Sequence, residues 1–536
     1  LFVCLSVCLF VCLSVCLFVC LSFFSLIFFL DRANLTEECV KVLQETGVKV
    51  VSLVCDGPKV HVSMMRKLGA SINADSPNTQ ILQDLDGPSI EALHDMVHNM
   101  KNVRNSWSKI ETLKNGNGDT IDWNFIVKLH KLQESEKLRA ANKLTSKHIY
   151  FENFKMKAYL ALQVFSRSVA KSLKFCREVL KLPDFQHSEA TEEFLLIMND
   201  IFDLFNSKSP AGIKLKGPMR TSNKKYWQPV LERTRSYIGS LTNGVTGANM
   251  TRKDPKKTGF LGIVCNIQAI ERIFDNVVTE GGCHYLLTYK CSQDHLEHFF
   301  GVVRSRLGPN NNPTPREFKT IYKRLLLGVT NFKVEGSNVL LQDNSEMVAI
   351  IPSPQEKINF IAENYRLDDF NFDLITKNSY SEYKTQVIEY VAGYVVKRIK
   401  EKLTCTECID SLLGSPALRP ASLITTRDYG EFMSYPSHFA QNVMNTADKI
   451  LDEEMKNGNW LQKKYFFDYV CIKIAKVFVE NSVCPVPCNH GYELIMKIIS
   501  CYSSIILKHY MKLENEKIKK NRIRSKLNRY IINNHE

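Results

Sequence analysis

The sequence contains no Gly-x-x-x-x-Gly-Lys-Ser/Thr motif, so it lacks the phosphate-binding loop of Walker-type nucleotide sites. No arrangement of Ser, His and Asp or of Cys and His indicates a nucleophilic hydrolase. Cysteine is scarce once the first 20 residues are set aside, because these hold five of the 17 cysteines. The remaining cysteine usage is typical of a reduced, intracellular protein and excludes a small disulfide-stapled scaffold.

Charged residues are also absent from positions 1–30, which repeat every four residues as Cys-Leu-Ser-Val or Cys-Leu-Phe-Val. The segment exceeds the ~20 residues that span a bilayer, but it has neither the basic start nor the small-residue cleavage site of a secretory signal. A four-nucleotide DNA repeat, translated through all three frames, produces the same pattern. We therefore favour a translated repeat or mis-joined exon over a membrane anchor, and we expect the fold to begin at Asp31.

The whole chain has 536 residues, with 70 Lys and Arg against 56 Asp and Glu, which gives a net charge of +14. At roughly 150 residues per domain, this length predicts three or four domains of ordinary globular composition. The positive balance favours a polyanionic partner.

The first ordered segment reads as a helix followed by a strand. Residues 34–46 begin with capping residues and acids and end at Gly47, which predicts a helix with a glycine stop. Residues 48–55 form a β-branched run typical of a buried parallel strand. Asp56 follows that strand, at the kind of position where α/β proteins bind ligands. The alternative is that Asp56 and Gly57 only form the turn into a helix over 60–68.

Helical patterns dominate from residue 129 to 182 and again over 194–205. The expected apolar stripe of the first region consists of Met156, Leu160, Val164, Val169, Leu173, Cys176 and Leu180. Residues 210–257 are rich in Gly, Ser, Asn and basic residues and are expected to form mostly loops, before an apolar segment at 259–266. This succession predicts a largely helical insertion within an α/β domain. The pattern beyond residue 340 is helical again and ends in a basic tail.

The segment 292–306 contains the sharpest local signal for chemistry. A helix here would bury a stripe made of Leu296, Phe299, Phe300 and Val303. Asp294 and Glu297 would then share the neighbouring face. Together with Asp56 they would supply the oxygen ligands that Mg²⁺ prefers. The alternative is an ordinary helix start, with Ser292 as the cap and Asp294 favoured by the helix dipole.

A second helix is predicted to start at Thr314, because Pro315 and Glu317 complete a capping box with proline at the first helical position. Basic residues gather along this helix and just before it. They are Arg304, Arg306, Arg316, Lys319 and Lys323. This set could neutralise DNA phosphates, although a solvated basic face explains the same residues.

Cys405 and Cys408 have the spacing of half a zinc site, which Cys484, Cys488 and His490 could complete. The long gap between the two groups favours reduced cysteines without a metal.

Several blocks occur together in an order that resembles the P-element transposases and the THAP-domain-containing DNA transposases of animals. The blocks are residues 32–35, 50–57, Asp95 with His98 and 101–105, 141–148, 258–262, 292–297, 310–314 and 391–396. The resemblance runs from about Asp31 to at least residue 410.

This resemblance implies an α/β plus α architecture, in which an RNase H-like domain is interrupted by a mainly helical GTP-binding insertion and followed by a helical C-terminal region. It implies DNA cleavage and strand transfer by three acidic residues and Mg²⁺, with Asp56 as the second acid and Glu297 as the third. Asp294 resembles a residue of the adjacent guanine-nucleotide site. The nucleotide contacts implied within the insertion are Lys143, Lys157, Ser166, Asp203 and Asn206.

The expected boundaries are 1–30 for the repeat, 31–128 and 281–335 for the two RNase H-like parts, 129–280 for the insertion and 336–536 for the C-terminal region. The first acid, its strands and the family's zinc finger have no counterpart after Asp31, so we expect a truncated and catalytically incomplete chain. Transposon-end DNA, a guanine nucleotide and a second copy of the chain are the expected partners, in the nucleus. The alternative is a domesticated protein that binds DNA or GTP without cutting.

Overall fold

The computed structural model describes the chain in several stretches, which divide into two compact units. The stretches are 2–4, 29–57, 59–84, 89–306, 313–327, 361, 365, 380–415, 422–428, 433–456, 460, 465–480 and 490–511. The N-terminal unit comprises 1–132, 141–177 and 182–344, and the C-terminal unit comprises 133–140, 178–181 and 345–536. The repeat at 5–28 and the basic tail beyond 511 lie outside the described residues.

The N-terminal unit contains a four-stranded sheet with the order β1-β2-β4-β3. Strand β2 (Lys49–Cys55) runs parallel to β1 (Phe2–Cys4) on one side and to β4 (Ile90–His94) on the other, and β3 (Gln80–Ile81) is antiparallel to β4. Six of the seven β2 residues are buried or half-buried, which confirms the predicted buried parallel strand.

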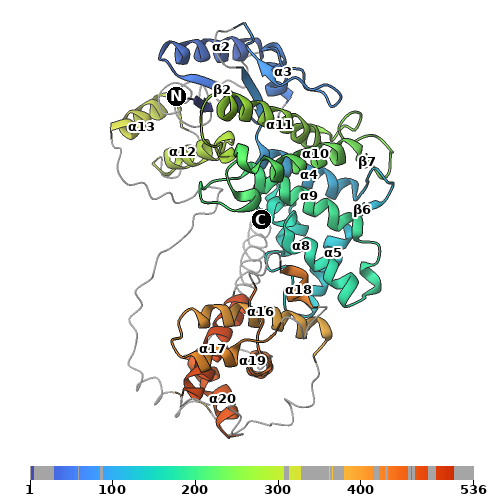
Figure 1. Ribbon diagram of the computed structural model, residues 1–536, viewed down its shortest axis with the longest axis vertical. Coiled ribbons are helices and arrows are strands. Elements are labelled where there is room, and N and C mark those ends of the chain that lie inside the picture. Colours follow the sequence, from blue (N-terminus) through green and yellow to red (C-terminus); the bar gives the residue numbers. More distant parts are fainter. Residues whose placement is uncertain are drawn as a thin grey trace, which may run out of the picture. The chain divides into compact units, whose positions relative to one another are not determined.

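Helices α2 (Phe29–Glu45), α3 (Lys59–Lys67) and α11 (Thr258–Phe274) share one hydrophobic core with this sheet. Figure 1 shows β2 of this sheet close to α2, α3 and α11. Helix α2 starts five residues before the predicted Asn34. Ala33, which precedes the predicted start, is 2% exposed and belongs to the core. Strand β1 also precedes Asp31, so the expectation that the fold begins at Asp31 is wrong. The predicted glycine stop is confirmed, since Gly47 follows the helix with φ of 80°.

Helix α4 (Met96–Ile110) begins directly after β4 and packs against α11. The apolar segment 259–266 belongs to α11. The side chain of Asn266 accepts a hydrogen bond from the His94 backbone N at 2.8 Å and donates one to the His94 backbone oxygen at 2.6 Å. A Cβ at Gly259 would lie 2.8 Å from the backbone oxygen of Asn99. Glycine therefore allows α11 to approach α4 at this point.

The residues between α4 and α11 form a mainly helical layer with a small antiparallel sheet. Its helices are α5 (Asn124–Ser135), α6 (Ser146–Ile149), α7 (Ala158–Val164), α8 (Arg167–Lys174), a π-helical turn (Phe175–Val179), α9 (Glu189–Phe205) and α10 (Lys224–Ser240). Its sheet has the order β6 (Thr120–Asp122), β5 (Thr112–Lys114), β7 (Thr242–Asn243). Near the C-terminal end of α4, the fully buried Trp107 makes edge contacts with Trp123 and Phe194, with ring centroids 4.9 and 5.2 Å apart.

Two expectations for this layer are wrong. Met156 was placed on the buried stripe but is 73% exposed, because it lies in a turn between η2 (Glu152–Phe154) and α7. Residues 224–240 were expected to be loop but form α10. Its buried positions Trp227, Leu231 and Ile238 have helical spacing that the surrounding polar residues and Pro229 obscure in the sequence.

Helices α12 (Asp294–Ser305) and α13 (Pro315–Leu327) pack together through an aromatic cluster. Three residues of the predicted stripe lie in this contact, with Val303 fully buried and Phe299 and Phe300 half-buried against Phe318. The fourth, Leu296, is also buried. The capping box is confirmed, because the Glu317 carboxylate accepts from the Thr314 backbone N at 2.8 Å.

The C-terminal unit is helical where it is described. It contains α16 (Glu382–Lys400), α17 (Thr406–Leu412), α18 (Leu423–Arg427), α19 (His438–Lys456), α20 (Phe466–Glu480) and a helix over 491–511. A buried ion pair of 2.9 Å joins Lys384 of α16 to Asp448 of α19, and the Tyr502 hydroxyl donates to the same carboxylate at 2.9 Å.

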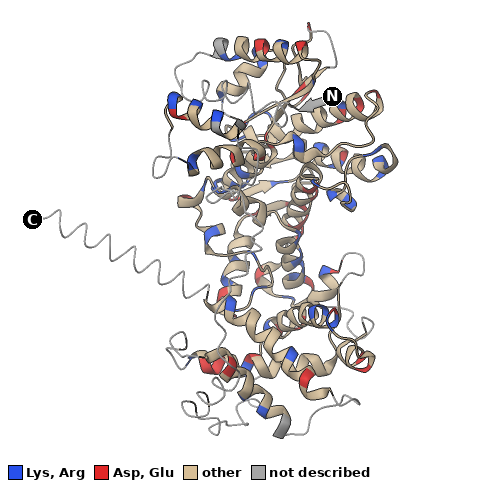
Figure 2. Cartoon of the chain, turned by 90° about the vertical axis from the view of Figure 1, so that its left-hand side faces the viewer, with Lys and Arg blue, Asp and Glu red and all other residues tan. Residues whose placement is uncertain are grey.

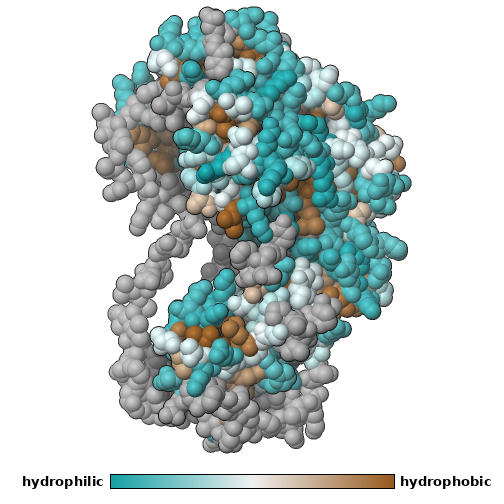
Figure 3. Space-filling model, viewed as in Figure 1, coloured by the Kyte–Doolittle hydropathy of each residue, from teal (hydrophilic) through white to brown (hydrophobic). Residues whose placement is uncertain are grey.

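The visible surface is mostly hydrophilic, with hydrophobic residues in small separate groups (Figure 3). In the described part of the chain, we find no helix that combines the length and the apolar character needed to cross a membrane.

Candidate active site

Two acidic residues follow neighbouring parallel strands at the same edge of the sheet. Asp56 comes directly after β2, and Asp95 comes directly after β4. The Asp95 backbone N donates to the oxygen of Cys55 at 2.9 Å, so the two strand ends are held together. Carboxyl ends of parallel strands are where α/β sheets bind ligands, which makes this edge the candidate site.

The start of α12 is attached to this edge by hydrogen bonds. The backbone N of Gln293 donates to Asp95 Oδ1 at 3.2 Å, and its side chain donates to the oxygen of Val54 at 3.5 Å. Gln293, rather than the expected Ser292, is therefore the N-cap residue of α12, while the Ser292 hydroxyl donates to the oxygen of Tyr289. This attachment places Asp294 and Glu297, both in the first turn, beside the strand ends.

His98 connects the two strand-end carboxylates. Its Nδ1 lies 2.6 Å from Asp95 Oδ2 and 3.4 Å from Asp56 Oδ1. Burial works against a charge on this imidazole, but the hydrogen bond to Asp95 and the negative charges of Asp95 and Asp56 outweigh it and raise the pKa of His98. Asp95 also caps α4, since it accepts from the His98 backbone N at 3.0 Å.

The electrostatics indicate one crowded group of charges. Burial lowers the pKa of Lys101, against the attraction of Asp56, Glu297 and Asp95. Burial likewise raises the pKa of Glu297, and the nearby Asp95 and Asp294 raise it further. Glu297 is thus a carboxyl that gives up its proton reluctantly unless positive charge is brought to it.

The residues present fit a divalent cation. Within the described residues, Asp56 Oδ1 is buried and accepts no hydrogen bond, and its nearest charged partner is His98 Nδ1 at 3.4 Å, so it keeps a lone pair that could bind a cation. Asp56 and Glu297 offer carboxylate oxygens, the donors that Mg²⁺ prefers. The pairing of Asp56 with Glu297 as metal ligands stays a prediction.

Sequence reasoning assigned no role to Asp95, His98 or Lys101. The available signal was an Asp followed three residues later by a polar partner at a helix start, which is typical of an N-cap. That signal alone cannot show that the cap lies next to Asp56, because their proximity depends on the pairing of β2 with β4.

Two of the expected nucleotide contacts lie close together through Asn199 of α9. Ser166 is the N-cap of α8, and the next backbone N, that of Arg167, donates to Asn199 Oδ1 at 3.1 Å. Asn199 Nδ2 in turn donates to Asp203 Oδ2 at 3.2 Å. Burial raises the pKa of Asp203, which Lys216 partly offsets from 3.7 Å.

The end of α9 is joined to the segment that leads into α12. Asn206 is the C-cap of α9, and the following Ser207 backbone N donates to the Thr288 hydroxyl at 3.2 Å. One residue on, Lys208 Nζ lies 4.0 Å from Asp294 Oδ2. Asp294 is therefore close to the residues that follow α9, and its assignment to a nucleotide site stays a prediction.

The other two expected nucleotide contacts are not joined to this group by any contact among the described residues. Lys157 is the N-cap of α7, with Nζ 5.3 Å from the ring of Phe154. Lys143 is exposed in the turn before α6.

The expected DNA-contacting residues lie on α12 and α13. Arg316, Lys319 and Lys323 are exposed on the side of α13 opposite its buried Phe318, and Arg304 and Arg306 lie at the end of α12. Figure 2 shows that Lys and Arg are interspersed with Asp and Glu on other helices as well. A basic side is thus present, but its position alone does not distinguish DNA contact from a solvated face.

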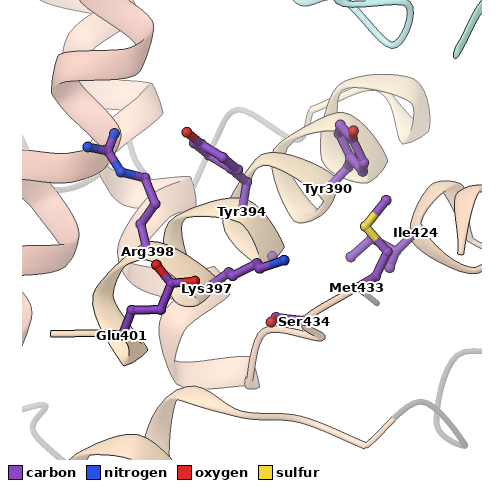
Figure 4. A pocket seen from close by; sticks show the side chains of 9 residues that line it. Tyr390, Tyr394, Lys397, Arg398, Glu401, Ile424, Met433 and Ser434 are labelled. Carbon is purple, nitrogen blue, oxygen red and sulfur yellow. The ribbon is translucent and has the colours of Figure 1, made fainter. Parts of the chain in front are cut away.

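A pocket of about 380 Å³ lies in the C-terminal unit, between α16 and the segment that contains Met433 and Ser434 (Figure 4). Figure 4 shows the Lys397 side chain extending toward that segment. A Cβ at Gly393 would collide with the backbone oxygen of Ser434. Glycine at this position therefore allows the close packing that borders the pocket.

Comparison with known families covers most of the chain in four parts. Residues 4–69 match the TNP-like RNase H N-terminal domain, 97–218 the TNP-like GTP-binding insertion domain, 289–323 the TNP-like RNase H C-terminal domain and 379–512 the C-terminal domain of DNA transposase THAP9. These matches confirm the expected order of an RNase H-like fold interrupted by a GTP-binding-type insertion.

Two curated proteins and one solved structure are similar to this chain. The chain is 25% identical to human DNA transposase THAP9 over 90% of its own length and 57% of that protein, and 27% identical to the Drosophila melanogaster Transposable element P transposase over 71% and 50%. It thus spans about half the length of these curated relatives. It is also similar to the solved Drosophila P element transposase strand transfer complex, with 27% identity, a TM-score of 0.48 and coverage of 55% of this chain and 64% of that one.

Proposed function

Because the chain belongs to the P-element and THAP9-type transposases, we propose that Asp56 and Glu297 hold a divalent metal, Mg²⁺, for the cleavage and transfer of DNA strands. The observation that carries this proposal is the convergence of β2, β4 and the first turn of α12, held by the Gln293–Asp95 hydrogen bond. It puts a carboxylate oxygen of Asp56 that accepts no hydrogen bond and a desolvated Glu297 in one group of charges.

Each side chain of the group then has a distinct task. When bound, the metal activates the attacking oxygen and stabilises the charge that develops on the phosphate. Asp56 and Glu297 supply the ligand oxygens. His98 orients Asp56 and Asp95 through its Nδ1, and Lys101 contributes positive charge that moderates the repulsion among the carboxylates.

The family resemblance implies three catalytic acids and assigns two of them, Asp56 and Glu297, to residues of this polypeptide. We expect it to bind the cation without cutting DNA efficiently, because a two-metal mechanism needs a ligand shared between both ions.

Cation binding by this polypeptide tests the proposal directly. Mn²⁺ bound in place of Mg²⁺ is measured by electron paramagnetic resonance, with Asp56→Asn and Glu297→Gln as the test variants. Both should weaken binding at least tenfold, whereas Glu317→Gln, at the exposed capping box of α13, should leave it unchanged. Equal binding by all four proteins would refute the metal site. A strand-cleavage assay in parallel should detect no Mg²⁺-dependent product.

The insertion is proposed to bind GTP. The support is the connected arrangement of Ser166, Asn199 and Asp203, and the Lys208–Asp294 contact that joins it to the start of α12. Asn206 is the C-cap of α9, and like Lys143 and Lys157 it is proposed from resemblance alone. Asp203→Ala should weaken the binding of a fluorescent GTP analogue at least tenfold, and Glu193→Ala, on the same helix but paired with Arg233 instead, serves as the matched control.

DNA is the proposed macromolecular partner, with the basic side of α12 and α13 contacting phosphates, and the nucleus is the proposed location. A second copy of the chain is a further proposed partner. The alternative function is a binding protein that retains GTP and DNA contacts without catalysis. The observation that favours this alternative is that all the nucleotide contacts implied by the resemblance have an assigned residue in this chain. Only two of the three catalytic acids have one.

A further inference from the structure

Three potential metal ligands meet within the C-terminal unit. They are the sulfur atoms of Cys405 and Cys408 and a ring nitrogen of His490, and all three atoms lie within 4.8 Å of one another. They come from segments that are far apart in the sequence, so chain proximity does not explain the grouping of all three.

Local structure explains how each segment presents its ligands. Cys405 is the N-cap of α17 and Cys408 lies in its first turn, so both side chains project from the same side of one turn. His490 lies at the start of the helix over 491–511, where its oxygen accepts from the Leu494 backbone N at 2.9 Å. Leu412 and Leu494 are fully buried, so both elements are anchored in the core of the unit near the ligands.

We propose that Cys405, Cys408 and His490 bind a zinc ion that joins α17 to the helix over 491–511. Thiolate and imidazole are the ligands that zinc selects, in contrast to the oxygen donors of the carboxylate group in the N-terminal unit. The separation of the three atoms is that of ligands around a single tetrahedral ion, since Zn–S and Zn–N bonds of about 2.3 and 2.0 Å place ligand atoms less than about 5 Å apart.

Burial also fits a metal that enters from solvent and is held at the edge of the core. Cys408 is 1% exposed, Cys405 is half-buried and His490 is exposed. Cys484 and Cys488, which the sequence grouped with this pair, lie outside the described residues. The proposal rests on the three ligands alone.

Metal content of the full chain tests the site. The protein is purified without chelator, and its zinc is measured by mass spectrometry. Zinc is then replaced by Co²⁺, whose absorption reports tetrahedral geometry and thiolate ligation. We expect about one zinc per chain and a thiolate-to-cobalt band. His490→Ala and Cys405→Ser should each raise the Kd for Zn²⁺ more than about 100-fold, beyond the effect of losing an outer hydrogen-bond partner.

Cys501→Ser is the matched control, because Cys501 is a half-buried cysteine on the same helix that follows His490. It should retain full zinc content and the cobalt spectrum. His490→Ala removes an exposed side chain and should still fold, which circular dichroism confirms before the titration. The proposal is overturned by a chain that binds no zinc, by His490→Ala and Cys405→Ser binding it as tightly as the parent, or by Cys501→Ser losing it equally.

Discussion

The two clusters of ionisable side chains in this protein differ in the atoms they offer and in what those atoms do to stability. The N-terminal unit gathers carboxylates at the ends of β2 and β4, where burial raises the pKa of Glu297 and therefore opposes its charge. The C-terminal unit gathers two sulfurs and an imidazole between two helices. Crowded carboxylates lower the stability of the unliganded fold, whereas a thiolate–imidazole site adds stability when the metal binds. We therefore assign catalysis to the carboxylate ligands of the N-terminal unit and structural stabilisation to the thiolate and imidazole ligands of the C-terminal unit.

The largest change in the stability of the folded protein should follow from removing zinc. A ligand that binds only the folded state stabilises it by about 4 kcal/mol at 1,000 times its Kd. Chelation should therefore accelerate amide hydrogen exchange in the helix over 491–511 by up to about 1,000-fold, with no change in β2 or β4. Added Zn²⁺ should restore protection and added Mg²⁺ should not. Uniform loss of protection in both units would remove the distinction between the two clusters.

Glu297→Gln should change stability less than the removal of zinc does, and it should increase stability rather than reduce it. Because the folded-state pKa of this carboxyl is raised, ionisation destabilises the fold increasingly as pH rises. The variant should be more stable than the parent at neutral pH, by about 1 kcal/mol as is common at functional sites, and equal to it below the carboxyl's unfolded pKa. Thermal unfolding across pH without divalent cations measures this.

Glu317→Gln provides the contrast, because hydrogen bonds from Thr314 lower the pKa of Glu317. That variant should lose stability above the carboxyl's unfolded pKa and match the parent in acid. If Glu297→Gln were also destabilising at neutral pH, the carboxylate group would be a structural ion network rather than a metal site.

A modest pH effect should come from His98. Its raised pKa means that the charged imidazole adds stability at pH values below the unfolded histidine pKa, and that this contribution is lost as pH rises through the folded-state value. The stability difference between the parent and His98→Gln should shrink over that interval. NMR titration should show His98 retaining its proton above the usual range, whereas burial lowers the pKa of His94 to about 4.

The smallest effect on stability should come from Arg316→Ala, Lys319→Ala and Lys323→Ala combined, within about 0.5 kcal/mol for each exposed position. DNA binding should nevertheless weaken, and the slope of log affinity against log salt should fall by roughly one for each phosphate that the variant no longer neutralises. Alanine at Arg398, Lys400 and Lys402, which are exposed in the C-terminal unit, is the control. Equal weakening in both triple variants would indicate non-specific charge rather than a surface on α13.

Local signals in the sequence were sufficient to predict those elements that are determined by a short stretch of chain. The glycine stop at Gly47, the strand at 49–55 and the Thr314–Glu317 capping box depend on short stretches of chain, and all are confirmed. The errors occur where packing overrides local pattern. Helix α10 forms because Trp227 and Leu231 are buried, despite a loop-like composition.

Pattern and family resemblance indicated Asp56 and Glu297, and cysteine spacing indicated Cys405 and Cys408. The sequence by itself thus determined which side chains could carry chemistry and in what order they occur. Only the tertiary structure decided that His98 bridges Asp56 to Asp95 and that His490 approaches both cysteines. The physical reason is that these contacts depend on the parallel pairing of β2 with β4 and on the packing of helices distant in the chain, neither of which local periodicity encodes.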